Sequence, residues 1–360
     1  MGAGLSGLSC ALILEKNGVK PYIFEKRSEV GDRFVNCEIF LSLLSHPIHD
    51  EIKYLAKQHD IFLKPQSNIV KLIIHSENEK AIITGQLGFT NLRGRIHNSF
   101  EKQLANQVKS KIILNSNFSY KKIAQEFSHV VLATGDAAYA EKLNNYNRHL
   151  TATLKGAIIK GRFSPNVVHA WLNNNLAPGG YGYLIPIDEN KANIVIGIPD
   201  HLYKNNLEEL WKNFCSEVKE IIQTPLKVVD EFEVKNYIMG VCPTPHIGNT
   251  YFVGNNFGTL MPFLGFGQFP ALLTGIYAAN DILDKTNYEK ELIPLYKSYS
   301  TSHNLRKVME MLDNKKYDFI VKKLNSNMGN KIFNSKINYL KIASLLIKPF
   351  TKLFYSKHQK

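Results

Sequence analysis

Met1-Gly-Ala-Gly-Leu-Ser-Gly7 opens the chain, and Ile23-Phe-Glu-Lys-Arg27 follows about one helix length later. Gly2, Gly4 and Gly7 have the G-x-G-x-x-G spacing of a dinucleotide-binding turn. The first glycine permits a tight turn, the second lets a pyrophosphate approach bare backbone, and the third lets the following helix pack close to a sheet. This stretch predicts a Rossmann-like α/β fold.

The residues around these glycines would supply the remaining contacts to a nucleotide. A helix is expected over residues 5–17, and its N-terminal amides, beginning with Leu5 and Ser6, would face the phosphates. A strand is expected over residues 19–24, which places Glu25 at its carboxyl end with Lys26 beside it. An acidic side chain at this place accepts hydrogen bonds from the ribose hydroxyls of an adenosine.

One element of the pattern is missing. In this fold the glycine turn follows a hydrophobic strand at the centre of the parallel sheet, but only Met1 precedes Gly2. A vacant central position would leave unpaired backbone groups on two neighbouring strands. We therefore expect that the recorded start omits a strand, rather than that the domain lacks one.

Composition places the chain among soluble globular proteins of two or three domains. It has 360 residues, 44% hydrophobic and 21% charged. No apolar run reaches the ~20 residues that span a bilayer, and no signal peptide opens the chain. The four cysteines form no C-x-x-C pair, which argues against a metal site or a disulfide scaffold and favours the cytoplasm.

The net charge of +13 is concentrated at the end of the chain. Residues 331–360 contain seven lysines and no acidic residue, interleaved with Ile and Leu. Such a basic amphipathic segment is typical of peripheral contact with an anionic membrane surface, here the inner face of the membrane. The alternative is a helix docked on the protein body with its lysines in solvent. Nucleic-acid binding is not expected, because no recognised module accompanies the charge.

The order of predicted elements divides the chain into three parts. A buried strand over residues 129–135 ends in a glycine, and a similar strand returns at 250–255. Between them, the sequence alternates like an antiparallel sheet. We expect a Rossmann-like domain split over residues 1–150 and 243–285, a mostly antiparallel β substrate domain over 151–242, and a helical, lysine-rich region over 286–360. A ligand cavity is expected where the first two meet.

Three motifs in this order resemble the flavoprotein superfamily typified by p-hydroxybenzoate hydroxylase, and within it the geranylgeranyl reductase-like oxidoreductases. They are the opening glycine turn with Glu25, then Ala133-Thr-Gly135, then Val253-Gly-Asn-Asn-Phe-Gly258 with Pro262-Phe-Leu-Gly-Phe-Gly267. The resemblance implies FAD as the cofactor. Besides the opening residues, it assigns to FAD the following: Arg33, Arg95, Ala133, Thr134, Gly135, Gly254, Asn255, Pro262, Gly265 and Gly267.

Two further stretches are similar to the reductase branch. Pro178-Gly-Gly-Tyr-Gly-Tyr-Leu-Ile-Pro186 resembles its P-x-x-Y-x-W-x-F-P element, and Val30-Gly-Asp-Arg33 with Cys37 resembles a segment that places a cysteine near flavin and substrate. The chain departs from the pattern at several positions. Asn255 replaces the usual Asp, which removes charge assistance to the ribityl group, and Glu38 follows Cys37 where a small residue is usual.

The resemblance implies an FAD-dependent oxidoreductase that reduces C=C bonds of an isoprenoid chain or lipid, with electrons from NAD(P)H, ferredoxin or a deazaflavin. Tyr181 or Tyr183 would order the substrate or relay a proton, or would simply be packed sheet aromatics. Cys37 is either a functional thiol or a small buried residue. Two rival functions remain: a flavin monooxygenase on the same fold, and a flavin-free protein that binds a membrane surface.

Overall fold

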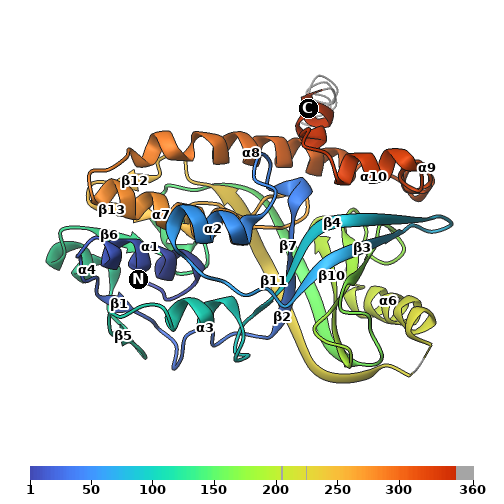
Figure 1. Ribbon diagram of the computed structural model, residues 1–360, viewed down its shortest axis with the longest axis horizontal. Coiled ribbons are helices and arrows are strands. Elements are labelled where there is room, and N and C mark those ends of the chain that lie inside the picture. Colours follow the sequence, from blue (N-terminus) through green and yellow to red (C-terminus); the bar gives the residue numbers. More distant parts are fainter. Residues whose placement is uncertain (204–205, 224, 346–360) are drawn as a thin grey trace.

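The computed structural model describes residues 1–203, 206–223 and 225–345. Figure 1 shows a region of short strands and helices beside a large curved sheet, with a long helix running over both. The first region contains parallel pairs, as the glycine turn predicts. β1 (Ile23–Phe24) pairs with β5 (Ile112–Ile113), and β6 (Val130–Leu132) pairs with β13 (Thr250–Phe252), which is antiparallel to β12 (His246–Ile247).

The first residues of the chain lie between these two small sheets. The amino group of Met1 donates to the Val131 carbonyl at 2.8 Å, and the Ala133 amide donates to the Met1 carbonyl at 2.7 Å. On the other side, the Gly2 amide donates to the Phe24 carbonyl at 2.7 Å. These contacts bring the glycine turn to the carboxyl ends of both β1 and β6.

Two helices pack closely behind the glycine turn. α1 (Leu5–Lys16) lies against α7 (Gln268–Ile282), and a Cβ on Gly275 would lie 2.1 Å from the Ser6 carbonyl oxygen. The Ser9 hydroxyl donates across the interface to the Leu272 carbonyl at 3.0 Å. The other helices of this region are α2 (Glu51–His59), α3 (Phe100–Ala105), α4 (Tyr120–Glu126), α5 (Ala138–Lys142) and the single turn η2 (Gly254–Asn256).

The large sheet has eight strands, and only the contact between β3 and β8 is parallel. One face is covered by α6 (Leu207–Ile222), whose Trp211 and Phe214 pack into the core beneath it. In spatial order the strands are β11 (Lys227–Val241), β7 (Asn147–Lys160), β10 (Lys191–Pro199), β9 (Tyr181–Pro186), β8 (Val167–Trp171), β3 (Ser67–His75), β4 (Lys80–Arg93) and β2 (Asn36–Leu41), after which comes the turn η1 (Ser42–Leu44).

The sheet recruits a segment that the sequence-based division assigned to the nucleotide-binding domain. Residues 36–93 contribute β2, β3 and β4 to the same sheet as residues 147–241. β3 pairs with β8 from Lys71↔Val167 to His75↔Trp171, so its apolar side chains complete the same core. The inserted sheet predicted over residues 151–242 therefore forms only part of the sheet, because its open edge pairs with strands from earlier in the chain.

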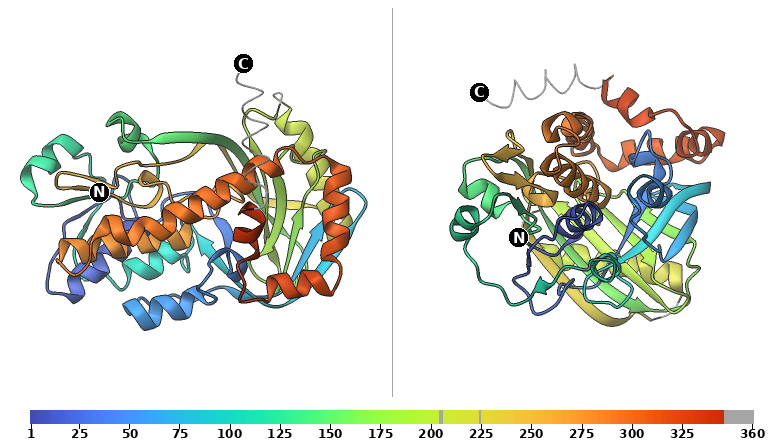
Figure 2. Two further views of the ribbon diagram at one scale, coloured as in Figure 1. Left: turned by 90° about the horizontal axis from the view of Figure 1, so that it is seen from above. Right: turned by 60° about the vertical axis from the view of Figure 1, so that its left-hand side comes forward.

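Helices again follow α7, in the region expected to be helical. α8 (Tyr288–Met309) spans both halves of the molecule, and α9 (Asn314–Leu324) and α10 (Asn327–Phe333) lie along β4 (Figure 2). A further helical segment begins at residue 339. Of the basic segment predicted over 331–360, residues 346–360 lie outside the described residues. No helix in the described ranges is both long and apolar enough to cross a membrane.

A buried carboxyl at the start of α2 gives the fold a pH-dependent stability. Glu51 is fully buried, accepts a hydrogen bond from the Ser45 hydroxyl, and its Oε2 has no partner among the described residues. Burial raises the pKa of Glu51 from 4.5 to about 7. The folded state therefore keeps a proton that the unfolded chain has released, and the free energy of unfolding falls as the pH rises from 4.5 to 7.

We expect Glu51→Gln to remove this dependence. The variant should gain about 3 kcal/mol over the native chain at pH 8 and little at pH 4.5, since each pKa unit corresponds to ~1.4 kcal/mol. Urea unfolding of both proteins at the two pH values measures the difference. A gain of equal size at both pH values would contradict the ionisation argument.

Candidate active site

A single cavity of about 1490 Å³ lies between the nucleotide-binding region, the large sheet and the C-terminal helices. One end is lined by the glycine turn, the Ala133–Gly135 loop and residues 254–268. The other end extends along the sheet under α9 and α10 and is apolar. The side chains that form this apolar arm are Leu41, Leu43, Leu72, Ile74, Val168, Leu172, Ile185, Met309, Leu312, Tyr317, Ile320, Leu324, Ile332, Phe333 and Leu340.

The glycines at the polar end form a cradle with room for a ligand. A Cβ on Gly4 or Gly135 would meet no atom within 4 Å, and one on Gly265 would have Met239 Cε, at 3.9 Å, as its nearest neighbour. All three line the cavity. Gly7 acts differently, because a Cβ there would lie 2.1 Å from the Gly2 carbonyl oxygen. The third glycine of the motif therefore serves packing, as its place in the spacing predicts.

An unpaired amide also marks this end of the cavity as a binding site. Gln268, at the first position of α7, lines the cavity and is only 5% exposed. Neither its oxygen nor its nitrogen has a hydrogen-bond partner among the described residues. Because a buried polar group without a partner is costly, a bound polar molecule is the natural partner for it. The open cradle and this amide together fit a dinucleotide with a heteroaromatic ring.

Glu25 occupies the position predicted for the ribose contact. Its Oε2 accepts from the Ala3 amide at 2.7 Å, and its Oε1 accepts from the Arg27 amide at 3.0 Å. These bonds fix the carboxylate at the cavity wall, next to Lys26, while each oxygen retains a further lone pair for a ligand hydroxyl.

Hydrogen bonds join the second and third predicted motifs. The Asn255 amide nitrogen donates to the Gly135 carbonyl at 2.9 Å, and the Asn256 amide nitrogen donates to the Thr134 hydroxyl at 2.5 Å. The Gly254 amide donates to the Thr274 hydroxyl at 2.9 Å. The Ala133–Gly135 loop and the Gly254–Asn256 turn thus form one rigid wall of the cavity.

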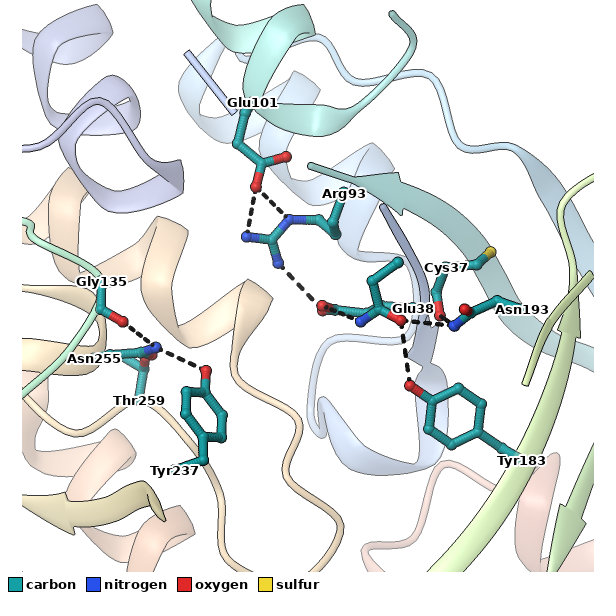
Figure 3. Close-up of polar contacts among 11 residues, drawn as sticks. Cys37, Glu38, Arg93, Glu101, Gly135, Tyr183, Asn193, Tyr237, Asn255 and Thr259 are labelled. Carbon is teal, nitrogen blue, oxygen red and sulfur yellow. Dashed lines mark hydrogen bonds and ion pairs between the residues drawn. The ribbon is translucent and has the colours of Figure 1, made fainter. Parts of the chain in front are cut away.

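A buried charged network forms the opposite wall (Figure 3). The Arg93 guanidinium lies 3.2 Å from Glu38 Oε2 and 2.9 Å from Glu101 Oε1. Burial alone would raise the pKa of the Glu101 carboxyl, but the Arg93 charge beside it holds that pKa below its ordinary value. Asn36 extends the network by donating to Glu38 at 2.9 Å. Sequence reasoning missed this network, although Glu38 had been noticed as a departure from the family pattern.

The network changes the assignment of the predicted arginine. Arg95 points to the surface, where it pairs with Asp230 at 2.7 Å and is about half exposed, and it does not line the cavity. Arg93, two residues earlier, lines the cavity instead. Gly94, with φ of +93°, turns the chain between the two arginines. Arg33 lines the cavity as predicted.

The candidate catalytic side chains have different surroundings. The Tyr181 and Tyr183 side chains line the cavity, and burial raises the pKa of both hydroxyls. The Tyr181 hydroxyl donates to the Leu264 carbonyl at 2.5 Å, whereas the Tyr183 hydroxyl makes only a long contact of 3.4 Å to Asn36. The Cys37 thiol lies in the core, 3.8 Å from the Pro186 carbonyl, and does not line the cavity. Burial raises its pKa, so the structure does not bring a reactive thiolate to the site.

Helix α8 holds the glycine-rich loop that closes the polar end. The Ser302 hydroxyl accepts from the Phe263 amide at 2.8 Å, and the Arg306 guanidinium donates to the Phe263 carbonyl at 3.3 Å. Arg306 also donates to the Gly179 carbonyl and pairs with Glu310. It therefore ties the 262–267 loop to the segment before β9. No sequence signal pointed to these residues, because the contacts join segments far apart in the chain.

Except for Gly7, Cys37 and Arg95, every residue assigned to the site from sequence lines this cavity.

The comparisons with known proteins agree with the arrangement. A profile of the geranylgeranyl reductase catalytic domain matches residues 150–230, and one of an NAD(P)-binding Rossmann-like domain matches residues 1–37. Digeranylgeranylglycerophospholipid reductase 3 of Methanosphaera stadtmanae is 22% identical over 339 residues, covering 84% of this chain and 82% of that protein. The chain is an oxidoreductase similar to the geranylgeranyl reductases.

Solved structures show the same fold for this reductase-like chain. A geranylgeranyl bacteriochlorophyll reductase-like protein from Thermoplasma acidophilum superposes with a TM-score of 0.71 at 15% identity, covering 98% of this chain and 97% of that one. The flavin-dependent brominase Bmp2 superposes with a TM-score of 0.69 at 14% identity, covering 99% and 98%. The glycine cradle and the fold together support a flavin cofactor.

Proposed function

We propose that the protein binds FAD at the polar end of the cavity and reduces C=C bonds of an isoprenoid chain carried by a lipid. The observation that carries the proposal is the continuity of one cavity, which joins a glycine-lined nucleotide cradle to a long apolar arm. An aromatic substrate for a monooxygenase would need a pocket of ring size, whereas this arm extends along the sheet as far as α10.

The residues present would bind FAD along the polar end. Glu25 would accept hydrogen bonds from the ribose hydroxyls, and the open backbone at Gly4 would leave room for the pyrophosphate at the N-terminus of α1. Gly254 and Asn255 would contact the ribityl group, and the loop over residues 262–267 would cover the ring. A bound, reduced flavin supplies a hydride to an alkene carbon.

The chain's own groups then exclude water and hold a proton. The apolar arm surrounds the substrate chain with aliphatic side chains, which keeps the reacting carbons dry. Tyr183 Oη retains its proton, because burial raises its pKa, and its weak contact to Asn36 leaves that proton available to the cavity. Tyr183 is therefore the better candidate of the two tyrosines for proton relay, since Tyr181 holds the 262–267 loop.

The test is product analysis under anaerobic conditions. Purified protein is loaded with FAD, reduced by dithionite, and mixed with a geranylgeranyl-bearing glycerophospholipid. Mass spectrometry should find two added hydrogens per double bond reduced. One added oxygen in the presence of air and NAD(P)H would indicate the monooxygenase instead. Replacing dithionite by NAD(P)H, reduced ferredoxin or a reduced deazaflavin identifies the class of external electron donor.

We also propose that the outer face of the C-terminal helices contacts an anionic membrane. Phe319, Ile337 and Ile342 are 62%, 51% and 45% exposed, and lysines lie among them. Apolar side chains ringed by lysines favour the surface of an anionic bilayer. The inner faces of the same helices line the apolar arm, so a lipid substrate would enter from the surface on which they lie.

Replacing Ile337 and Ile342 together by Asp should reduce binding to vesicles of phosphatidylglycerol about tenfold or more, as measured by flotation. The matched control replaces Val228 and Val229 by Asp, since these are equally exposed but lie on β11. Equal loss in both variants, or binding by neither the native chain nor the control, would argue against this surface.

A further inference from the structure

The Asn255 side chain makes three hydrogen bonds, and its partners determine which atom donates in each of them (Figure 3). Its Nδ2 donates to the Gly135 carbonyl at 2.9 Å and to the Tyr237 hydroxyl at 3.1 Å. Its Oδ1 accepts from the Thr259 hydroxyl at 3.1 Å. The side chain thus joins the Ala133–Gly135 loop, the turn before the 262–267 loop and strand β11 of the large sheet.

The orientation of the amide follows from the chemistry of its neighbours. A backbone carbonyl can only accept, so the nitrogen of Asn255 must face Gly135. The second hydrogen on that nitrogen then points to the Tyr237 oxygen, which accepts it. The Tyr237 hydroxyl therefore cannot give its own hydrogen to Asn255 and must direct it elsewhere.

The free direction of the Tyr237 hydrogen is into the cavity. Tyr237 lines the cavity, and among the described residues its hydroxyl donates no hydrogen bond to a protein acceptor. The charged groups that act on it are Arg33 and Arg93, which can only donate, and Glu38, to which its hydroxyl makes no hydrogen bond. Burial raises the pKa of Tyr237, so the hydroxyl stays protonated at neutral pH.

We propose that Tyr237 donates a hydrogen bond to an acceptor atom of the bound flavin, and that Asn255 sets the direction of this bond. The inference rests on the proposed function, because an isoprenoid chain has no acceptor to offer. It also gives a reason for Asn rather than Asp at position 255 of this chain. A carboxylate at position 255 would accept the Tyr237 hydrogen and would repel the Gly135 carbonyl.

A double-mutant cycle tests the inference. The FAD dissociation constant is measured by quenching of flavin fluorescence for the native chain, Tyr237→Phe, Asn255→Asp and the double variant, together with the visible spectrum of each complex. Tyr237→Phe should weaken FAD binding about tenfold, as expected for one lost hydrogen bond to a buried acceptor. Asn255→Asp should weaken FAD binding more in the native chain than in the Tyr237→Phe variant. Only the native chain has a Tyr237 hydroxyl whose hydrogen the new carboxylate could accept.

Controls separate this role from a structural one. Tyr203→Phe removes a hydroxyl that contacts Thr153 on the sheet, outside the cavity, and should bind FAD normally. Thermal unfolding without FAD checks that the variants fold. Normal FAD binding by Tyr237→Phe, or additive effects in the cycle, would overturn the inference alone. Failure of the native chain to bind FAD would overturn the proposed function and this inference with it.

Discussion

Arg93→Met is expected to lower the free energy of unfolding by about 3–5 kcal/mol, because it leaves buried carboxylates without their counter-charge. Glu101 is 3% exposed and Glu38 is only partly exposed, and both lose their guanidinium partner. A methionine fills much of the volume of the arginine stem but offers no donor. The remaining carboxylates must then either stay charged in an apolar wall or take up protons.

Arg95→Met is the matched control. Arg95 lies two residues further along the chain and also pairs with a carboxylate, Asp230, but both partners are substantially exposed. Pairs of this kind contribute about 0–1 kcal/mol. Urea unfolding should therefore separate the two variants clearly, and adding Glu101→Gln to Arg93→Met should recover part of the loss. Equal losses for Arg93→Met and Arg95→Met would contradict the assigned burial of the network.

The contrast between these arginines illustrates what sequence could predict. The glycine turn with Glu25 was predicted from its spacing. The Ala133–Gly135 loop and the 254–267 segment were predicted from their resemblance to family motifs, whose glycines allow close approach to the backbone. Such requirements leave a fixed spacing in the sequence. The segments assigned in this way lie together around one cavity.

Contacts between distant segments left no such spacing. Arg93 points into the cavity and Arg95 points to the surface, because Gly94 between them turns the backbone. Similarly, adjacent side chains of β2 point to opposite faces of the sheet, so Glu38 joins the charged network while Cys37 packs in the apolar core. Ser302 and Arg306 on α8 contact a loop some forty residues earlier, and β3 pairs with β8 about one hundred residues later.

The second large effect is expected at the glycine cradle, where Gly4→Val should abolish FAD binding while the protein still folds. Gly4 has φ of −90° and ψ of −170°, a conformation that any residue adopts. A Cβ added at position 4 would meet no protein atom within 4 Å, so a valine side chain would project into the cavity. That space is where the pyrophosphate must approach the amides of α1.

Fluorescence titration should give an FAD affinity at least ~100-fold lower, since overlap with a bound group costs about as much as overpacking in a core. Thermal unfolding without FAD should be nearly unchanged. Gly7→Ala supplies the contrast, because its Cβ would lie 2.1 Å from the Gly2 carbonyl oxygen and should destabilise the fold itself. Retention of FAD by Gly4→Val would mean that the pyrophosphate does not lie against this turn.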